Sequence, residues 1–167
     1  GSLPFYIQNE LNFLVKRANS LGMPVAIHAI GDRGVEMALN AFEYSNHLNY
    51  ANRVEHVEVV QPGTVERFRK LGVTASMQPN HGTGVIGKYI TPRIGEEREQ
   101  FAYVWNDFLK GGVRLALSSD FATSPFSPLV QLYDAVFRES PSGLYDGPWY
   151  PDQRISFDEA LYAYTQI

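Results

Sequence analysis

The sequence contains no cysteine, no long hydrophobic run and no cluster of basic residues. Without cysteine, disulfide bonds and thiolate ligands are excluded, so a transition-metal site must use histidines and carboxylates. No apolar stretch approaches the ~20 residues of a membrane-spanning helix, and no signal-peptide pattern is present. The net charge is −4 with both signs scattered along the chain, which argues against a nucleic acid or an anionic membrane as partner. We expect a cytoplasmic protein.

The 167 residues are enough for one domain with a hydrophobic core, and a hydrophobic content of 44% is ordinary for a globular protein. No low-complexity tract or linker divides the chain, so we expect residues 1–167 to form a single unit. The leading Gly1 and Ser2 are expected to be the remnant of a cloning tag.

Short apolar segments alternate with segments whose apolar residues have helical spacing. The predicted strands cover residues 25–28, 54–60, 73–79 and 113–120, after a first helix over about 5–21. We expect Asp32 to cap the second helix, a long loop from residue 80 to about 95, and a helix over roughly 96–110. A last helix is expected to start at Ser156, which has capping-box spacing to Glu159. This alternation predicts an α/β fold of four parallel βα units.

Three residues that can bind a metal or move a proton lie in or at the end of these strands. His28 closes the first strand, His56 lies within the second and Asp120 closes the fourth. The carboxyl ends of parallel strands share one rim, so the three side chains are expected to converge there. Two imidazoles and a carboxylate suit a zinc-like ion, which lowers the pKa of a coordinated water towards ~7.

Each of these residues also has a structural explanation. A single strand histidine is more often a satisfied core residue than a ligand, and Asp120 alone could cap the loop that follows it. The shared position of all three favours the metal hypothesis. Residues 82–88 match the spacing of a phosphate-binding loop, but Tyr89 stands where Ser or Thr is needed and Pro92 interrupts the required helix. This disfavours a phosphate-binding loop. A phosphate-binding barrel enzyme such as an aldolase or isomerase is disfavoured because no lysine stands at a strand end and the glycine-rich loop follows the wrong strand for the usual phosphate site.

Four ordered motifs resemble one known family over nearly the whole chain, from about residue 5 onwards. The motifs are VAIHAIGDRGVEMALNAFE, RVEHVEVVQPGTVERFRKLGVTASMQPNH, RIGEEREQFAYVWNDFLKGGVRLALSSDFATSP and ISFDEALYAYT. They resemble the YtcJ-like branch, amidohydrolase family 3, of the metal-dependent amidohydrolase superfamily. The resemblance implies a hydrolase of amide-type, non-peptide C–N bonds on a (β/α)₈ TIM barrel.

The resemblance also implies a role for each matching residue. His28 and His56 would be the metal ligands of the fifth and sixth barrel strands. Asp120 would be the aspartate of the eighth strand, which binds metal and is the general base for the attacking water. His81 would bind substrate or polarise its carbonyl, and Arg93 would contact substrate or anchor a loop. Asp32 would support the metal ligands without binding the metal itself, or would cap the helix that follows.

The chain departs from the family pattern at its start. Family members begin with a His-x-His pair and add a bridging lysine or acidic ligand, and neither is found here at a strand end. A whole barrel needs about 250 residues, so we expect the C-terminal half of the barrel, as a fragment of a larger enzyme. Zinc is the expected metal, with one or two ions in the intact enzyme and weak or no binding in this fragment.

Two further expectations follow from a half barrel. Its first and last strands have unpaired edges, which predicts self-association. The isolated chain is expected to have negligible hydrolytic activity towards a small amide-type substrate. The alternative hypothesis is a non-catalytic half barrel or binding module whose histidines are structural.

Overall fold

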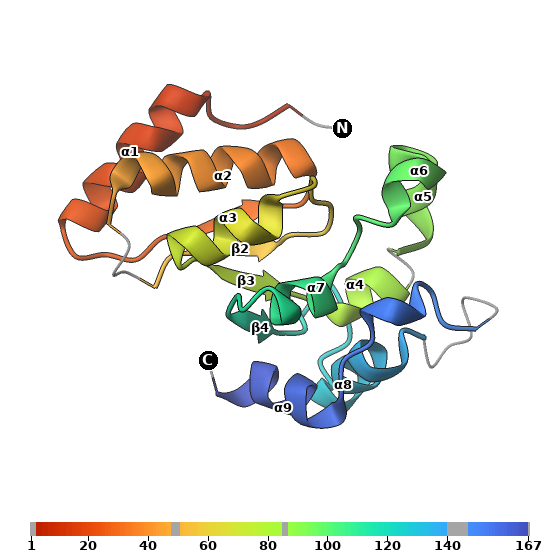
Figure 1. Cartoon of the computed structure of the whole chain (residues 1–167). Helices are drawn as coiled ribbons and strands as arrows, with labels where there is room; N and C mark the ends of the chain where they lie inside the picture. The colour runs from red at the N-terminus through yellow and green to blue at the C-terminus, as the bar shows by residue number, and fades with distance from the viewer. Residues whose placement is uncertain (1–2, 48–50, 85–86, 140–146, 167) are drawn as a thin grey trace.

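The protein contains one four-stranded parallel sheet flanked by helices (Figure 1). The computed structural model describes residues 3–47, 51–84, 87–139 and 147–166, so the expected tag remnant at residues 1–2 lies outside it. The strands are β1 (Ala26–Ala29), β2 (Arg53–His56), β3 (Thr74–Met77) and β4 (Leu115–Leu117), in the order β1-β2-β3-β4. The predicted α/β fold of four parallel βα units is confirmed, although each strand is shorter than, or shifted from, its predicted segment.

The helices connect the strands and cover the sheet. In chain order they are α1 (Gln8–Ser20), α2 (Asp32–Ser45), α3 (Thr64–Leu71), α4 (Pro79–Thr83), α5 (Ile90–Ile94), α6 (Glu96–Glu99), α7 (Trp105–Lys110), α8 (Pro128–Phe137) and α9 (Phe157–Thr165), with 3₁₀ turns η1 (Gly87–Tyr89) and η2 (Pro151–Gln153). Figure 1 shows α1 and α2 side by side at the β1 end of the molecule, and α8 and α9 near β4. No helix in the described ranges is long and apolar enough to cross a membrane.

The core lies between the sheet and these helices. Three residues that are neighbours across the sheet, Val54, Ala75 and Leu115, are buried. Phe68 of α3 meets Phe108 of α7 edge to face, with ring centroids 5.0 Å apart. These contacts fix the sheet and therefore the positions of the residues at its carboxyl end.

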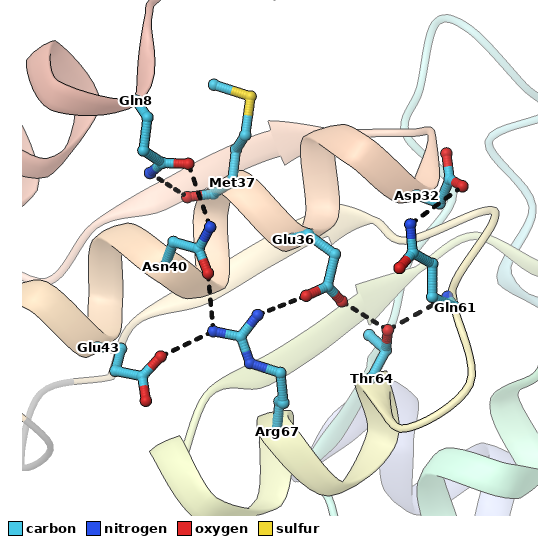
Figure 2. Close-up of polar contacts among 9 residues, drawn as sticks. All are labelled: Gln8, Asp32, Glu36, Met37, Asn40, Glu43, Gln61, Thr64 and Arg67. Atoms are coloured by element: carbon cyan, nitrogen blue, oxygen red, sulfur yellow. Dashed lines mark hydrogen bonds and ion pairs between the residues drawn. The ribbon is translucent and has the colours of Figure 1, made fainter.

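Polar contacts also tie the outer helices together (Figure 2). The guanidinium group of Arg67 on α3 lies between Glu36 and Glu43 of α2 and binds both carboxylates. Thr64 donates to Glu36 with an oxygen–oxygen distance of 2.7 Å, and the Gln8 amide of α1 donates to a carbonyl of α2 at 3.0 Å. The three helices are therefore joined by side-chain hydrogen bonds as well as by apolar packing.

Three local predictions were wrong. The expected helix over residues 96–110 is broken into α6 and α7, because the backbone between them bonds to the segment after β2: Tyr103 N–H donates to the Glu58 carbonyl at 2.8 Å. The expected loop over residues 80–95 contains α4, η1 and α5, while residues 85–86 of the glycine-rich stretch lie outside the described residues. Asp32 is the first residue of α2, whose cap is Gly31.

The last helix begins as the sequence predicted. The Ser156 hydroxyl accepts a hydrogen bond from the backbone N–H of Glu159, and the Glu159 carboxylate accepts one from the backbone N–H of Ser156. This reciprocal capping box satisfies two backbone donors that would otherwise lack helical partners.

Candidate metal centre

Histidine and aspartate side chains gather at the carboxyl end of the sheet. His28 lies in β1 and His56 ends β2, and their ring centroids are 4.5 Å apart. His81 lies on α4, directly after β3, with its ring stacked 5.8 Å from that of His56. Asp120 follows β4, and its Oδ2 lies 3.8 Å from Nε2 of His81. The structure thus links His28 to His56, His56 to His81 and His81 to Asp120 at this end of the sheet, and the roles predicted for His28, His56 and Asp120 as one ligand set stay predictions.

A sharp change of backbone direction shapes this cluster. β2 ends at His56 because His56 and Val57 have φ angles of 78° and 49°, a region that non-glycine residues seldom adopt. Such a conformation costs about 1–3 kcal/mol per residue, so the surrounding contacts must hold it. The Val57 and Val59 N–H groups donate to the carbonyls of Ala29 and Ile30 at 3.1 and 3.0 Å. The turn carries Glu58 into the protein, where its side chain is buried.

His56 is held by an amide that also contacts the next strand. Its Nδ1 lies 2.9 Å from Oε1 of Gln78, while Nε2 of Gln78 donates to the Ser118 hydroxyl at 2.8 Å. With the Gln78 oxygen facing His56, the His56 proton lies on Nδ1. The Nε2 atom of the neutral ring then keeps its lone pair, as a metal ligand must.

Burial lowers the pKa of His56 below its usual value, and the nearby His28 lowers it further. The hydrogen bond to Gln78 and the charges of Asp120 and Glu58 act in the opposite direction. The net effect favours the neutral imidazole, which is the form that binds metal.

His81 makes a corresponding contact with Glu58. Its Nδ1 lies 3.2 Å from Oε1 of Glu58, and both side chains are almost completely buried, at 4% and 6% exposure. Its other nitrogen, Nε2, is buried and has no hydrogen-bond partner among the described residues. A buried ring nitrogen without a partner, close to a carboxylate, is the arrangement expected for a ligand atom.

These residues fit a divalent cation. His56, Glu58 and His81 each offer a ligand atom, and the three atoms lie within 4.8 Å of one another. Imidazole nitrogen and carboxylate oxygen are ligands that zinc-like ions accept. Asp120 adds a second carboxylate, and its side chain is 39% exposed to solvent.

Sequence reasoning missed Glu58 and Gln78. Glu58 stands two residues after His56, a spacing that would place both on one face of a strand, and this was the only signal for it. Gln78 directly follows β3 but carried no chemical pattern of its own. Both residues support the histidines through contacts between different elements.

The other two predicted site residues, Asp32 and Arg93, contact residues outside the histidine cluster. Asp32 accepts a hydrogen bond from Arg98 at 2.7 Å and is also bonded by Gln61 and the backbone of Arg33. Arg93 is exposed on α5, with its guanidinium carbon 5.7 Å from the ring centroid of Tyr89. Neither makes a hydrogen bond or ion pair with His28, His56 or Asp120 among the described residues. Their predicted roles stay predictions.

Most of this chain aligns with proteins from a plant and from bacteria. It is 35% identical to the protein LONG AFTER FAR-RED 3 of Arabidopsis thaliana over 93% of its length. It is 32% identical to the N-substituted formamide deformylase of Arthrobacter pascens and to the putative amidohydrolase YtcJ of Bacillus subtilis, over 96% and 93% of its length. The chain covers only 27%, 30% and 30% of these three proteins, respectively.

A solved structure shows the same architecture. A metal-dependent hydrolase from Pyrococcus furiosus superposes with a TM-score of 0.81 at 34% identity, over 98% of this chain and 32% of that one. The four parallel βα units correspond to the C-terminal half of the TIM barrel of these hydrolases, as the resemblance implied. The model of the amidohydrolase family matches residues 2–167. The chain belongs to the amidohydrolase family.

Proposed function

We propose that the protein is a metal-dependent hydrolase of amide-type, non-peptide C–N bonds in small molecules. The observation that supports this proposal is the cluster of three histidines and an aspartate at the carboxyl end of the sheet, in which His28 contacts His56, His56 contacts His81 and His81 lies near Asp120. Two relatives, an N-substituted formamide deformylase and a metal-dependent hydrolase, support the same reaction class. His28, His56 and Asp120 would hold the cation, for which zinc is the proposed identity, with one or two ions in a complete barrel.

The proposed chemistry divides between the cation and the side chains. When bound, a divalent cation supplies an acidified water and polarises a carbonyl group. Asp120 accepts the proton of the attacking water and passes it to the leaving nitrogen as general base and then general acid. Its partial exposure lets it reach both water and substrate. With its proton on Nδ1 towards Gln78, His56 would offer Nε2 as an electron-pair donor.

Arg93 and Asp32 are proposed to have roles outside the ligand set. Arg93 is exposed on α5 and is proposed as a substrate contact. Asp32 at the start of α2 pairs with Arg98 of α6, and this link between the two helices is the proposed form of its supporting role. The relatives are more than three times as long as the aligned segment, so their additional strands would complete the barrel. We therefore expect the isolated chain to bind metal weakly and to have negligible activity.

The alternative is a non-catalytic half barrel. It draws support from the internal hydrogen bonds of His56 to Gln78 and of His81 to Glu58, since structural histidines also make such bonds. The two proposals differ in whether the Nε2 atoms of these histidines bind a metal ion. Purely structural histidines would not bind one.

The test is zinc binding by the chain, measured by competition with a chelating dye. Asp120→Asn and His28→Ala should each lower zinc affinity, whereas Glu36→Gln, which alters a carboxylate between α2 and α3, should not. Hydrolysis of an N-substituted formamide should be abolished by Asp120→Asn in a full-length barrel that includes this chain. Zinc affinity that is unchanged by both site variants would overturn the proposal.

A further inference from the structure

The cluster contains one buried pair, Glu58 and His81, whose arrangement the predicted ligand set does not use. We infer that Glu58 is a positioning residue that turns His81 Nε2 towards the cation, which makes His81 a further metal ligand of this chain. The inference rests on the proposed function, because the cation is the one held with His56 and Asp120.

The first step is the position of the proton on His81. Glu58 is buried, and a buried carboxylate is stable only with a hydrogen-bond or charge partner. Its Oε1 lies 3.2 Å from Nδ1 of His81, so Nδ1 carries the proton and donates it. The opposite arrangement would point a nitrogen lone pair at the carboxylate and leave both groups unsatisfied. Glu58 therefore selects the form of His81 in which Nε2 has a free lone pair.

The second step concerns the surroundings of that lone pair. His81 Nε2 is buried without a hydrogen-bond partner among the described residues and lies 3.8 Å from Asp120 Oδ2. This separation is too long for a hydrogen bond. It is close to the roughly 3.4 Å between two ligand atoms that share a tetrahedral ion with bonds near 2.1 Å. The separation would allow both atoms to bind the same cation.

The third step is the repetition of the arrangement at His56. There, too, Nδ1 is held by a side-chain oxygen, Oε1 of Gln78 at 2.9 Å, while Nε2 is left free. Metal-bound histidines commonly donate their second N–H to a carboxylate or carbonyl, which fixes the ring and increases its basicity. Glu58 and Gln78 give the two rings this same support.

The experiment combines NMR with zinc titration. A long-range proton–nitrogen correlation spectrum of the metal-free chain should show the His81 proton on Nδ1 and a lone pair on Nε2. Glu58→Met removes the acceptor and should lower zinc affinity about 10–100-fold, the usual effect of losing such a support. Glu58→Gln keeps an acceptor oxygen and should retain the Nδ1–H form and most of the affinity. His81→Asn should lose affinity in the Glu58→Met range or beyond.

The outcomes separate this inference from the proposed function. If Asp120→Asn weakens zinc binding while Glu58→Met and His81→Asn do not, the metal proposal stands and the inference is wrong. A proton on Nε2 of His81 in the metal-free chain also overturns it, and that observation needs no variant. If the wild-type chain and Asp120→Asn bind zinc equally, the proposed function fails. Glu36→Gln controls for the loss of a carboxylate, and circular dichroism checks that each variant is folded.

Discussion

Asp134 on α8 should make the stability of the protein depend on pH in a way that one substitution removes. Its side chain is fully buried and accepts a hydrogen bond from the Asn80 amide at 2.7 Å. Burial raises the pKa of Asp134 from 3.8 to about 6, and the bond from Asn80 offsets only part of this effect. Each pKa unit corresponds to about 1.36 kcal/mol, so the change corresponds to about 3 kcal/mol.

The sign follows from proton binding. Between pH 3.8 and about 6 the folded protein holds this proton more tightly than the unfolded chain does. The contribution of Asp134 to the free energy of unfolding therefore falls as pH rises through this range, and its cost is fully present above about pH 7. The asparagine side chain of Asp134→Asn stays neutral at all pH values and can still accept a hydrogen bond from Asn80. The free energy of unfolding of this variant should therefore lack the unfavourable contribution of an ionised carboxylate.

The assay is urea unfolding at a series of pH values from 4 to 8. The unfolding free energy of Asp134→Asn minus that of the wild type should increase by about 2.4 kcal/mol from pH 4 to pH 7, because about 0.5 kcal/mol of the effect is already present at pH 4. Asp158→Asn, which changes an exposed aspartate, should alter the unfolding free energy by no more than about 0.5 kcal/mol. A constant difference between Asp134→Asn and the wild type across this range would refute the reasoning.

Three further predictions concern packing, capping and assembly. Gly82→Ala places a Cβ atom 2.9 Å from Cγ of the buried Tyr103 ring, and thermal unfolding should show a loss of about 1–3 kcal/mol; an unchanged midpoint would contradict this. Ser156→Ala removes the cap of α9 and should cost about 1 kcal/mol in urea unfolding, unlike the exposed Ser20→Ala. The edges of β1 and β4 each lack a neighbouring strand within the described sheet, so sedimentation velocity should show self-association with rising concentration. A single monomeric species at high concentration would count against that expectation.

The convergence of the predicted ligands could be foreseen because it depends only on strand order. His28 and His56 lie at the ends of adjacent parallel strands, and Asp120 follows the fourth, so the topology alone brings them to one rim. Ser156 and Glu159 were equally predictable, because a capping box is a local interaction.

The supporting residues could not be foreseen in the same way. Glu58 reaches His81 only because the backbone turns at Val57, where a β-branched residue takes a positive φ that no propensity predicts. Gln78 and His56 are 22 residues apart and meet only after β2 and β3 have paired. The break between α6 and α7 has a similar cause, since tertiary hydrogen bonds to the segment after β2 override the helical pattern.

The central claim is that the carboxyl end of this sheet binds a divalent cation. The most direct test is a crystal structure of the chain with zinc, with anomalous diffraction recorded on both sides of the zinc absorption edge. We predict an anomalous peak at bonding distance, about 2.0–2.2 Å, from His56 Nε2 and an Asp120 carboxylate oxygen. Zinc bound only elsewhere on the protein, with these atoms free, would contradict the account.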